Sequence, residues 1–433
     1  METNPLTRSL LSFLDASVCN FLASDTVARF IRPFGFTELD PADEWHLERG
    51  GNYFVRANNS SIFAFSVGTG TAADGYRIIA AHSDSPGFRI KPAPVMVSEG
   101  GLLKLNVEVY GGPILYTWFD RPLSISGRVI VKSTNPLRPA TRLVKIDRPL
   151  MTIPHLAIHF NRQVNDGNKL SRQKDMLPVV GIIKDEAERN NLLLNLVAES
   201  AGVSPADILD FDLTLYDVTP ASLFGPSNEF ISSGRIDDLM MVHAATTALT
   251  QTVNKPCKQT RIAAIFDNEE TGSGTKQGAA SPVLQGIIKR INAALGGDVS
   301  SYERSLYNSF MISADNAHAT HPNYVDKMDP TNHPVLGGGP VIKINADCKY
   351  MTDAESAAIY SNICELAGVK YQYFVNHSDS AGGSTLGNKS AAQLPLRGVD
   401  MGAPQLAMHS CREMAAVSDH IDTIASFATF FSL

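Results

Sequence analysis

Apolar residues recur along the chain at two spacings, and the dominant spacing changes twice. Helical spacing predicts a first helix over 6–32, and alternation predicts strands at 53–56 and 61–67. Between 93 and 230 apolar and polar residues alternate, and Gly and Pro turns separate the runs, which is typical of antiparallel strands. A helix over about 185–202 is expected within this region.

After Gly234 helices and strands alternate. The predicted helices span 237–252, 282–295, 354–367 and 418–432, with a further helical stretch after the second. The predicted strands span 261–266, 309–313, 340–345, 370–375 and 404–408. We therefore expect an α/β domain with a mostly parallel sheet, formed by residues 1–92 and 231–433 and interrupted by a β-rich insertion at 93–230.

Composition limits the class of protein. The 433 residues exceed what one hydrophobic core usually holds, so two domains are expected. A net charge of -7 gives no basic surface for nucleic acid. No apolar run approaches the roughly 20 residues that cross a bilayer, and the N-terminus lacks the pattern of a signal peptide. The five scattered cysteines form no Cys-x-x-Cys pair, which argues against disulfides and thiolate metal sites and predicts a reducing, cytoplasmic location.

Four apolar runs each end in side chains that can bind a metal. The runs 78–81, 262–266, 310–312 and 406–408 precede His82-Ser83-Asp84, Asp267-Asn268-Glu269-Glu270, Ser313-Ala314-Asp315 and His409, respectively. In an open parallel sheet, ligands bind outside the carboxyl ends of the strands. The four runs are therefore predicted to bring these residues to one site.

A further carboxylate, Asp237, stands at the start of a predicted helix, where an ordinary N-cap is the alternative interpretation. Taken singly, each of these residues has a commoner structural role. The set contains two histidines and three carboxylates, enough for two metal ions that share one bridging carboxylate: His82, Asp237, Glu270, Asp315 and His409. Nitrogen and oxygen ligands without thiolate suit zinc, and manganese or cobalt is also possible.

Two nearby carboxylates are candidates for roles other than ligation. Because adjacent side chains at a strand end point to opposite sides, one glutamate can bind metal while Glu269 faces the attacking water as general base. Asp84 is placed to orient His82, since metal-bound histidines usually donate their second N–H to a carboxylate. This set predicts a metallohydrolase.

Six motifs in order along the chain resemble the aspartyl aminopeptidase family of co-catalytic zinc exopeptidases. They are Ala81-His82-Ser83-Asp84-Ser85-Pro86, Thr117-Trp118-Phe119-Asp120-Arg121, Leu156-Ala157-Ile158-His159, Asp267-Asn268-Glu269-Glu270-x-Gly272-Ser273, the run from Ser313 to Tyr324, and Met408-His409-Ser410-x-Arg412-Glu413. The series spans nearly the full length of the chain.

The resemblance implies a role for each matching residue. His82 and Asp315 would hold one zinc, Glu270 and His409 the other, and Asp237 would bridge them, with Glu269 as base and Asp84 as orienter. The family has Asp followed by Asn where this chain has Asp237-Asp238, which leaves open which aspartate bridges. His159, from the insertion domain of a neighbouring subunit, would stabilise the oxyanion. The family forms large homo-oligomers, typically dodecamers.

The resemblance also implies peptide substrates with N-terminal Asp or Glu. Lys343 lies within an otherwise apolar strand and is a candidate to read the acidic side chain, although a snorkelling surface lysine has the same pattern. Tyr350 and His318 match further substrate-pocket positions of the family.

Other functions stay open at this point. The same metal chemistry could serve neutral N-terminal residues, or a deacylase or carboxypeptidase, and a metal-stabilised scaffold needs no base such as Glu269. A serine hydrolase is disfavoured, because Gly382-Gly383-Ser384-Thr385-Leu386 has Leu where a nucleophile elbow needs Gly.

Overall fold

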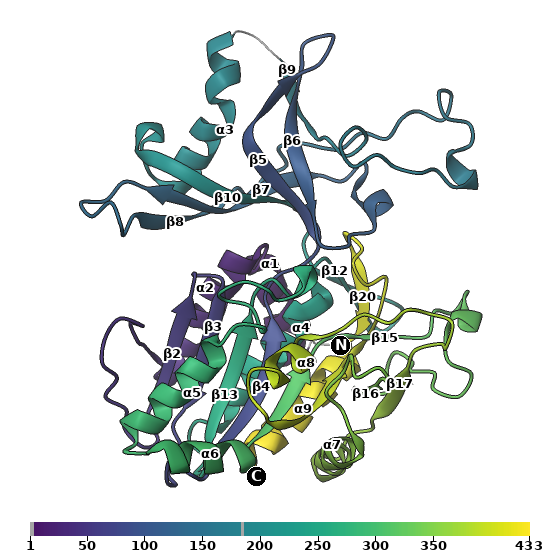
Figure 1. The fold of residues 1–433 in the computed structure, drawn as a ribbon. Helices are drawn as coiled ribbons and strands as arrows, with labels where there is room; N and C mark the ends of the chain where they lie inside the picture. The colour runs from purple at the N-terminus through teal and green to yellow at the C-terminus, as the bar shows by residue number, and fades with distance from the viewer. Residues whose placement is uncertain (1–3, 183–185) are drawn as a thin grey trace. The chain divides into compact units, whose positions relative to one another are not determined.

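The computed structural model describes residues 4–182 and 186–433, which form two compact units. The α/β unit comprises the chain up to Asp84, Ala221–Met408 and Glu413–Leu433; the β unit comprises Ser85–Pro220 and His409–Arg412. The expected helix near 185–202 is observed over Glu186–Ala201 (α3), and its expected first residue lies outside the described residues. Figure 1 shows the elements of both units.

The α/β unit is built on a nine-stranded sheet of order β1-β2-β3-β13-β4-β14-β18-β16-β17. The strands are β1 Thr37–Glu38, β2 Asn52–Ala57, β3 Ser61–Ser66, β4 Tyr76–His82, β13 Thr260–Phe266, β14 Phe310–Ala314, β16 Val341–Ile344, β17 Gln372–Val375 and β18 Arg397–Gly402. Its central strands β13, β4, β14 and β18 run parallel to one another. The predicted α/β class with a mostly parallel main sheet is confirmed.

Helices cover both faces of this sheet, and the alternation of side chains along β4 explains why. Ile79 and Ala81 pack into one apolar cluster, whereas Ile78 and Ala80 pack into another. The first cluster includes α1 Pro5–Ala16, α2 Asn20–Ile31, α4 Ile236–Thr252, α7 Ala354–Ala367 and α9 Val417–Ser432. The second includes α5 Val283–Ala294, α6 Val299–Tyr307 and α8 Leu386–Ala391. Within the described residues, no helix is long and apolar enough to cross a membrane.

One of the four apolar runs does not belong to the main sheet, contrary to the prediction. The run near 404–408 is a short strand, β19 Pro404–Leu406, and it belongs to a separate five-stranded sheet of the α/β unit. The other members are β11 Ser222–Phe224, β12 Phe230–Ser233, β15 Ala317–His318 and β20 Glu413–Ala416. The main-sheet strand nearest in sequence is β18. Its residues resemble those of a turn, so the sequence analysis did not predict a strand there.

Strand β18 needs its glycines because other backbone segments approach it closely. A Cβ on Gly398 would lie 2.6 Å from the carbonyl oxygen of Met311 on β14. A Cβ on Gly402 would lie 1.8 Å from the carbonyl oxygen of Asp315, well inside van der Waals contact. The sequence pattern therefore concealed a central strand whose glycines are required by packing.

The single helix expected over 6–32 is two helices, and this prediction was also wrong. Helix α1 ends at Ala16, and Cys19 is extended before α2 begins. The break directs the side chain of Asn20 to Asp267, whose two carboxylate oxygens each lie 3.1 Å from Asn20 Nδ2. A buried polar contact thus outweighs the continuous apolar periodicity.

The β unit is a six-stranded antiparallel sheet of order β8-β7-β10-β5-β6-β9. Its strands are β5 Gly87–Val97, β6 Leu102–Tyr110, β7 Leu123–Val131, β8 Ala140–Lys145, β9 Val179–Ile182 and β10 Ile208–Asp217. Alternate residues of β7, such as Leu123, Ile125 and Val129, are buried in the apolar core of this unit. The alternation read from the sequence is typical of such a sheet.

Candidate metal centre

Three adjacent parallel strands end in acidic or imidazole side chains at one edge of the main sheet. His82 is the last residue of β4 and is the ladder partner of Phe266, the last residue of β13. Asp315 directly follows β14, and Glu269 and Glu270 lie in a 3-10 turn, Glu269–Thr271, just after β13. This is the edge where an open parallel sheet binds ligands.

Potential ligand atoms lie close together at this edge. One oxygen or nitrogen from each of His82, Asp237, Asp238 and Asp315 lies within 4.8 Å of the others, and the same holds for His82, Glu269 and Glu270. His82 Nε2 is 3.4 Å from Asp237 Oδ1. We call these six residues the strand-end cluster: His82, Asp237, Asp238, Glu269, Glu270 and Asp315.

The start of α4 presents both aspartates of the cluster. Helix α4 begins at Ile236, and a kink follows at once at Asp237 and Asp238. Asp237 and Asp238 are joined by a cis peptide bond and have non-helical backbone angles. The Asp238 carboxylate accepts hydrogen bonds from the backbone N–H of His82 at 3.0 Å and of Asn316 at 3.3 Å. Asp238 therefore fixes the ends of β4 and β14 relative to α4.

Asp84 connects His82 with the 3-10 turn Glu269–Thr271, which we call the glutamate turn. Its carboxylate accepts hydrogen bonds from the backbone N–H groups of Glu269 at 3.1 Å and Glu270 at 3.2 Å. The same carboxylate lies 3.4 Å from His82 Nδ1, and the backbone oxygen of Asp84 lies 3.0 Å from that nitrogen. One buried carboxylate thus positions the imidazole and both glutamates.

Two acidic residues that support the strand-end cluster had no role assigned to them in the sequence analysis. Glu413 accepts a hydrogen bond from the backbone N–H of Asp237 at 3.1 Å and lies 3.3 Å from Gln405 Nε2. Asp267, two residues before the glutamate turn, accepts a hydrogen bond from the side chain of Asn20. The available signal was a charged residue directly before or directly after an apolar run, since burying such a residue requires partners.

The strand-end cluster concentrates negative charge away from water. Burial raises the pKa of Glu269 to about 8, and the carboxylates of Asp315, Asp84 and Asp237 add to the increase. Burial and neighbouring carboxylates also raise the pKa values of Glu270 and Asp238 well above the usual range.

The imidazole of His82 responds in the opposite sense. Burial lowers its pKa, but the carboxylates of Asp238, Asp237 and Asp84 outweigh burial and raise it well above the ordinary value. The carboxylates therefore stabilise positive charge at their centre. A buried set of imidazole and carboxylate donors fits zinc, so the residues present suit the predicted metal.

Lys343, on β16, lies next to the cluster. Its ammonium is 3.3 Å from Asp315 Oδ1 and 5.9 Å from the ring centroid of Tyr350. Lys343 is only 4% exposed and Tyr350 only 7%, so Lys343 is not a snorkelling surface lysine. Burial lowers the pKa of Lys343, but Asp315 and Tyr350 outweigh it and the net shift is upward, which keeps the ammonium charged.

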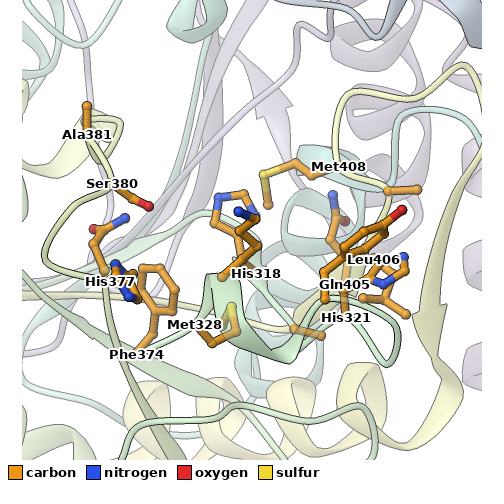
Figure 2. A pocket seen from close by; sticks show the side chains of 15 residues that line it. His318, His321, Met328, Phe374, His377, Ser380, Ala381, Gln405, Leu406 and Met408 are labelled. Atoms are coloured by element: carbon orange, nitrogen blue, oxygen red, sulfur yellow. The ribbon is translucent and has the colours of Figure 1, made fainter. Parts of the chain in front are cut away.

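His318 lines an open cavity of about 450 Å³ in the α/β unit, shown in Figure 2. We call it the histidine pocket. It is lined by His318, Ala319, His321, Tyr324, Lys327, Met328, Phe374, Asn376, His377, Ser380, Ala381, Gln405, Leu406, Ala407 and Met408.

Two predicted site residues, His409 and His159, belong to the β unit. His409 Nδ1 lies 3.1 Å from the backbone oxygen of Gly112. His159 is exposed in a turn after the strand-like segment at Met151–Ile153. Their roles as metal ligand and oxyanion donor stay predictions.

An α/β sheet with imidazole and carboxylate ligands at its strand ends defines this chain as a metallohydrolase of the zinc class. The family described as Aminopeptidase I zinc metalloprotease (M18) matches residues 13–431, and the chain belongs to that family. It is 49% identical over 428 residues to a probable M18 family aminopeptidase 2 of Clostridium acetobutylicum, covering 98% of each protein. A protein of the same description from Pseudomonas aeruginosa is 38% identical over 430 residues, covering 99% of this chain and 98% of that protein.

Solved structures agree with this assignment. The chain is similar to one described as "Cryo-EM structure of the Ape4 and Nbr1 complex", with a TM-score of 0.95, 37% identity, and coverage of 99% of this chain and 85% of that one. It is also similar to "Structure of S. cerevesiae mApe1 dodecamer", with a TM-score of 0.86, 26% identity, and coverage of 99% and 96%. The protein is therefore an aminopeptidase and a zinc metalloprotease.

Proposed function

We propose that this aminopeptidase uses two zinc ions per subunit to remove N-terminal Asp or Glu from peptides. The acidic preference is supported by the buried ammonium of Lys343, whose Nζ lies 3.3 Å from Oδ1 of the candidate ligand Asp315. A buried cation next to the reacting centre attracts a substrate carboxylate and disfavours an apolar side chain, because water cannot screen the charge.

The ligand assignment follows the chemistry of each donor. We assign His82 and Asp315 to one zinc, Glu270 and His409 to the other, and Asp237 to the bridge. Asp237 is favoured over Asp238 because both Asp238 oxygens accept backbone hydrogen bonds, whereas Asp237 Oδ1 faces His82 Nε2. Manganese or cobalt would suit the same donors.

Each remaining residue has a proposed role in the reaction. When bound, the metal pair supplies Lewis acidity toward the scissile carbonyl and acidifies the attacking water. Glu269 removes the proton from that water and passes it to the leaving amine. Asp84 positions the glutamate turn through its two backbone hydrogen bonds. His159 of a neighbouring subunit stabilises the developing oxyanion.

The substrate-binding groups complete the proposal. Lys343 binds the carboxylate of the N-terminal side chain, and Tyr350 packs beside Lys343. His318 contacts the peptide from the side of the histidine pocket. A homo-oligomer is supported by the related structure described as a dodecamer. We further propose a cytoplasmic enzyme that binds neither nucleic acid nor membranes, as composition suggests.

The test is the hydrolysis of Asp, Leu and acyl-capped Asp anilides by the zinc-loaded enzyme, with and without a chelator. We expect chelator-sensitive hydrolysis of the Asp anilide at least tenfold faster than of the Leu anilide. Faster hydrolysis of the Leu anilide would indicate a neutral preference, and hydrolysis of the capped substrate would indicate a deacylase.

Lys343→Met should remove most of the preference for Asp while hydrolysis of the Leu anilide persists. Lys289→Met, at an exposed position on α5, is the matched control. Because Lys343 is paired with Asp315, zinc content must be measured in each variant. Equal loss on both substrates with normal zinc content would contradict the assignment of Lys343.

A further inference from the structure

The histidine pocket has an unusual lining for an acidic protein. Its polar side chains are three imidazoles, one ammonium, two amides and two hydroxyls, and no Asp or Glu is among the residues that line it. The chain as a whole carries a net charge of -7. The carboxylate of Asp379 lies 4.0 Å from His377 Nδ1, but its side chain is exposed and does not line the pocket. A pocket lined without carboxylates in such a protein is suited to an anionic ligand.

Two of the imidazoles use Nδ1 as a hydrogen-bond acceptor. The Nδ1 atom of His321 accepts the backbone N–H of Asn323 at 3.2 Å, and the Nδ1 atom of His377 accepts that of Asp379 at 3.2 Å. In a neutral ring whose Nδ1 accepts, Nε2 carries the hydrogen. Figure 2 shows His318 between the sides of the pocket that carry His321 and His377.

The lining also offers a cation that is only weakly engaged. Lys327 lies 3.7 Å from Asp326, and the side chains of both residues are about three-quarters exposed, at 74% and 75%. An exposed ion pair of this kind contributes little, because water screens it. Lys327 lines the pocket, whereas Asp326 does not.

The pocket adjoins the residues assigned to the N-terminal side chain. Its wall residues Phe374 and Met328 pack in the same apolar cluster as Tyr350. Tyr350 is 7% exposed, whereas Tyr324 on the pocket is 57% exposed. An aminopeptidase encloses one residue and must let the remaining chain extend toward solvent. The open pocket therefore suits the part of the peptide after the scissile bond.

We propose that the histidine pocket binds a carboxylate on the leaving part of the peptide. The carboxylate is either the C-terminus of a short peptide or an acidic side chain soon after the scissile bond. Lys327 and the Nε2–H group of a pocket histidine such as His377 bind it through charge-assisted hydrogen bonds. This inference rests on the proposed function, because it extends the same substrate beyond its first residue.

The experiment compares the peptide Asp-Ala-Ala with a free C-terminus, its C-terminal amide, and Asp-Glu-Ala amide, using the zinc-loaded full-length enzyme. We expect kcat/KM about tenfold higher for the free acid than for its amide, mainly through KM. Recovery of that advantage by Asp-Glu-Ala amide would identify the side chain as an equally good source of the carboxylate; no recovery would identify the C-terminus.

Lys327→Met and His377→Gln should each reduce the ratio of free acid to amide toward one, whereas Lys289→Met should keep it. Because Lys327 is exposed, its substitution does not disturb the core. Equal hydrolysis of all three peptides by the unmodified enzyme, or a ratio that both pocket variants retain, would overturn the inference. Failure of the proposed function would instead appear as no zinc-dependent hydrolysis of any of the three peptides.

Discussion

The α/β unit buries imidazoles in two regions that differ in their surroundings. His82, at the end of β4, is 1% exposed, and the pair His243 and His420, on α4 and α9, is 0% exposed. His82 is surrounded by carboxylates. His243 lies instead against the aromatic rings of Phe13 and Phe30, at centroid distances of 5.4 and 5.7 Å.

The two regions shift the charge of histidine in opposite directions. Burial lowers the pKa of His243 to about 3 and lowers that of His420 well below its ordinary value. At His82 burial acts in the same sense, but neighbouring carboxylates outweigh it. Burial of a histidine therefore does not indicate a metal site. The number of carboxylates around it does.

The largest expected effect concerns the carboxylate assigned as base. Glu269→Gln removes the proton acceptor while leaving the backbone N–H that binds Asp84. We expect kcat for the Asp anilide to fall by about 10²–10⁴, the usual contribution of general acid–base catalysis. Zinc content, measured by elemental analysis, should remain normal. A fully active Glu269→Gln enzyme would show that another group accepts the proton.

Removing the metal should affect one histidine region and not the other. A cation that binds only the folded state at 100 times its Kd stabilises it by about 2.7 kcal/mol, so chelation should lower the thermal midpoint. Asp315→Asn should lower zinc content and reduce the response to chelator. His420→Gln should keep both the zinc content and the response to chelator. Zinc lost equally from the two variants would mean that the pair at His243 also supports the metal.

The sequence predicted most of the main sheet, because three strand ends carried their own signal. The apolar runs before His82, Glu269 and Asp315 are continuous, and β4, β13 and β14 lie side by side. The pattern could not reveal β18, since Gly398 and Gly402 are required by close backbone contacts and resemble turn residues. Nor could it show that Leu406 belongs to another sheet, because a short apolar run does not specify its partner strand.

The candidate site was likewise predictable in its residue types and not in its supporting contacts. A sequence shows that Asp84 follows His82, but not that its carboxylate binds the backbone of the glutamate turn. The role of Asp238 depends on hydrogen bonds to residues 156 and 78 positions away. Such contacts are set by tertiary structure, which periodicity does not encode.

The pH dependence of stability should distinguish the neutral imidazole pair. Because the folded pKa of His243 is lowered to about 3, the unfolded chain binds more protons below about pH 6.5. The pair's contribution is complete above that pH and is lost as pH falls toward 3. Each imidazole should cost about 1.4 kcal/mol per pH unit.

Thermal midpoints at pH 7.5 and 5.5 measure this effect. His420→Gln removes one of the two groups, so the midpoint should decrease less between the two pH values than in the unmodified protein. The measurement is best made with the chelated protein, since acid also competes with metal binding. An unchanged pH slope in His420→Gln would show that the acid sensitivity comes from elsewhere in the fold.

The smallest expected effect concerns the hydroxyl that contacts the pair. Ser9 Oγ lies 2.9 Å from His243 Nε2, and His243 Nδ1 lies 3.0 Å from His420 Nε2. Ser9→Ala leaves a buried ring nitrogen without its hydroxyl partner, so we expect a loss of about 1 kcal/mol in the free energy of unfolding. Ser12→Ala, exposed on the same helix, controls for the higher helix propensity of alanine. Equal stability of the two variants would mean that aromatic packing alone holds the imidazoles, whereas a loss confined to Ser9→Ala, with zinc content unchanged, would show that neutral hydrogen bonds stabilise this region as carboxylates do around His82.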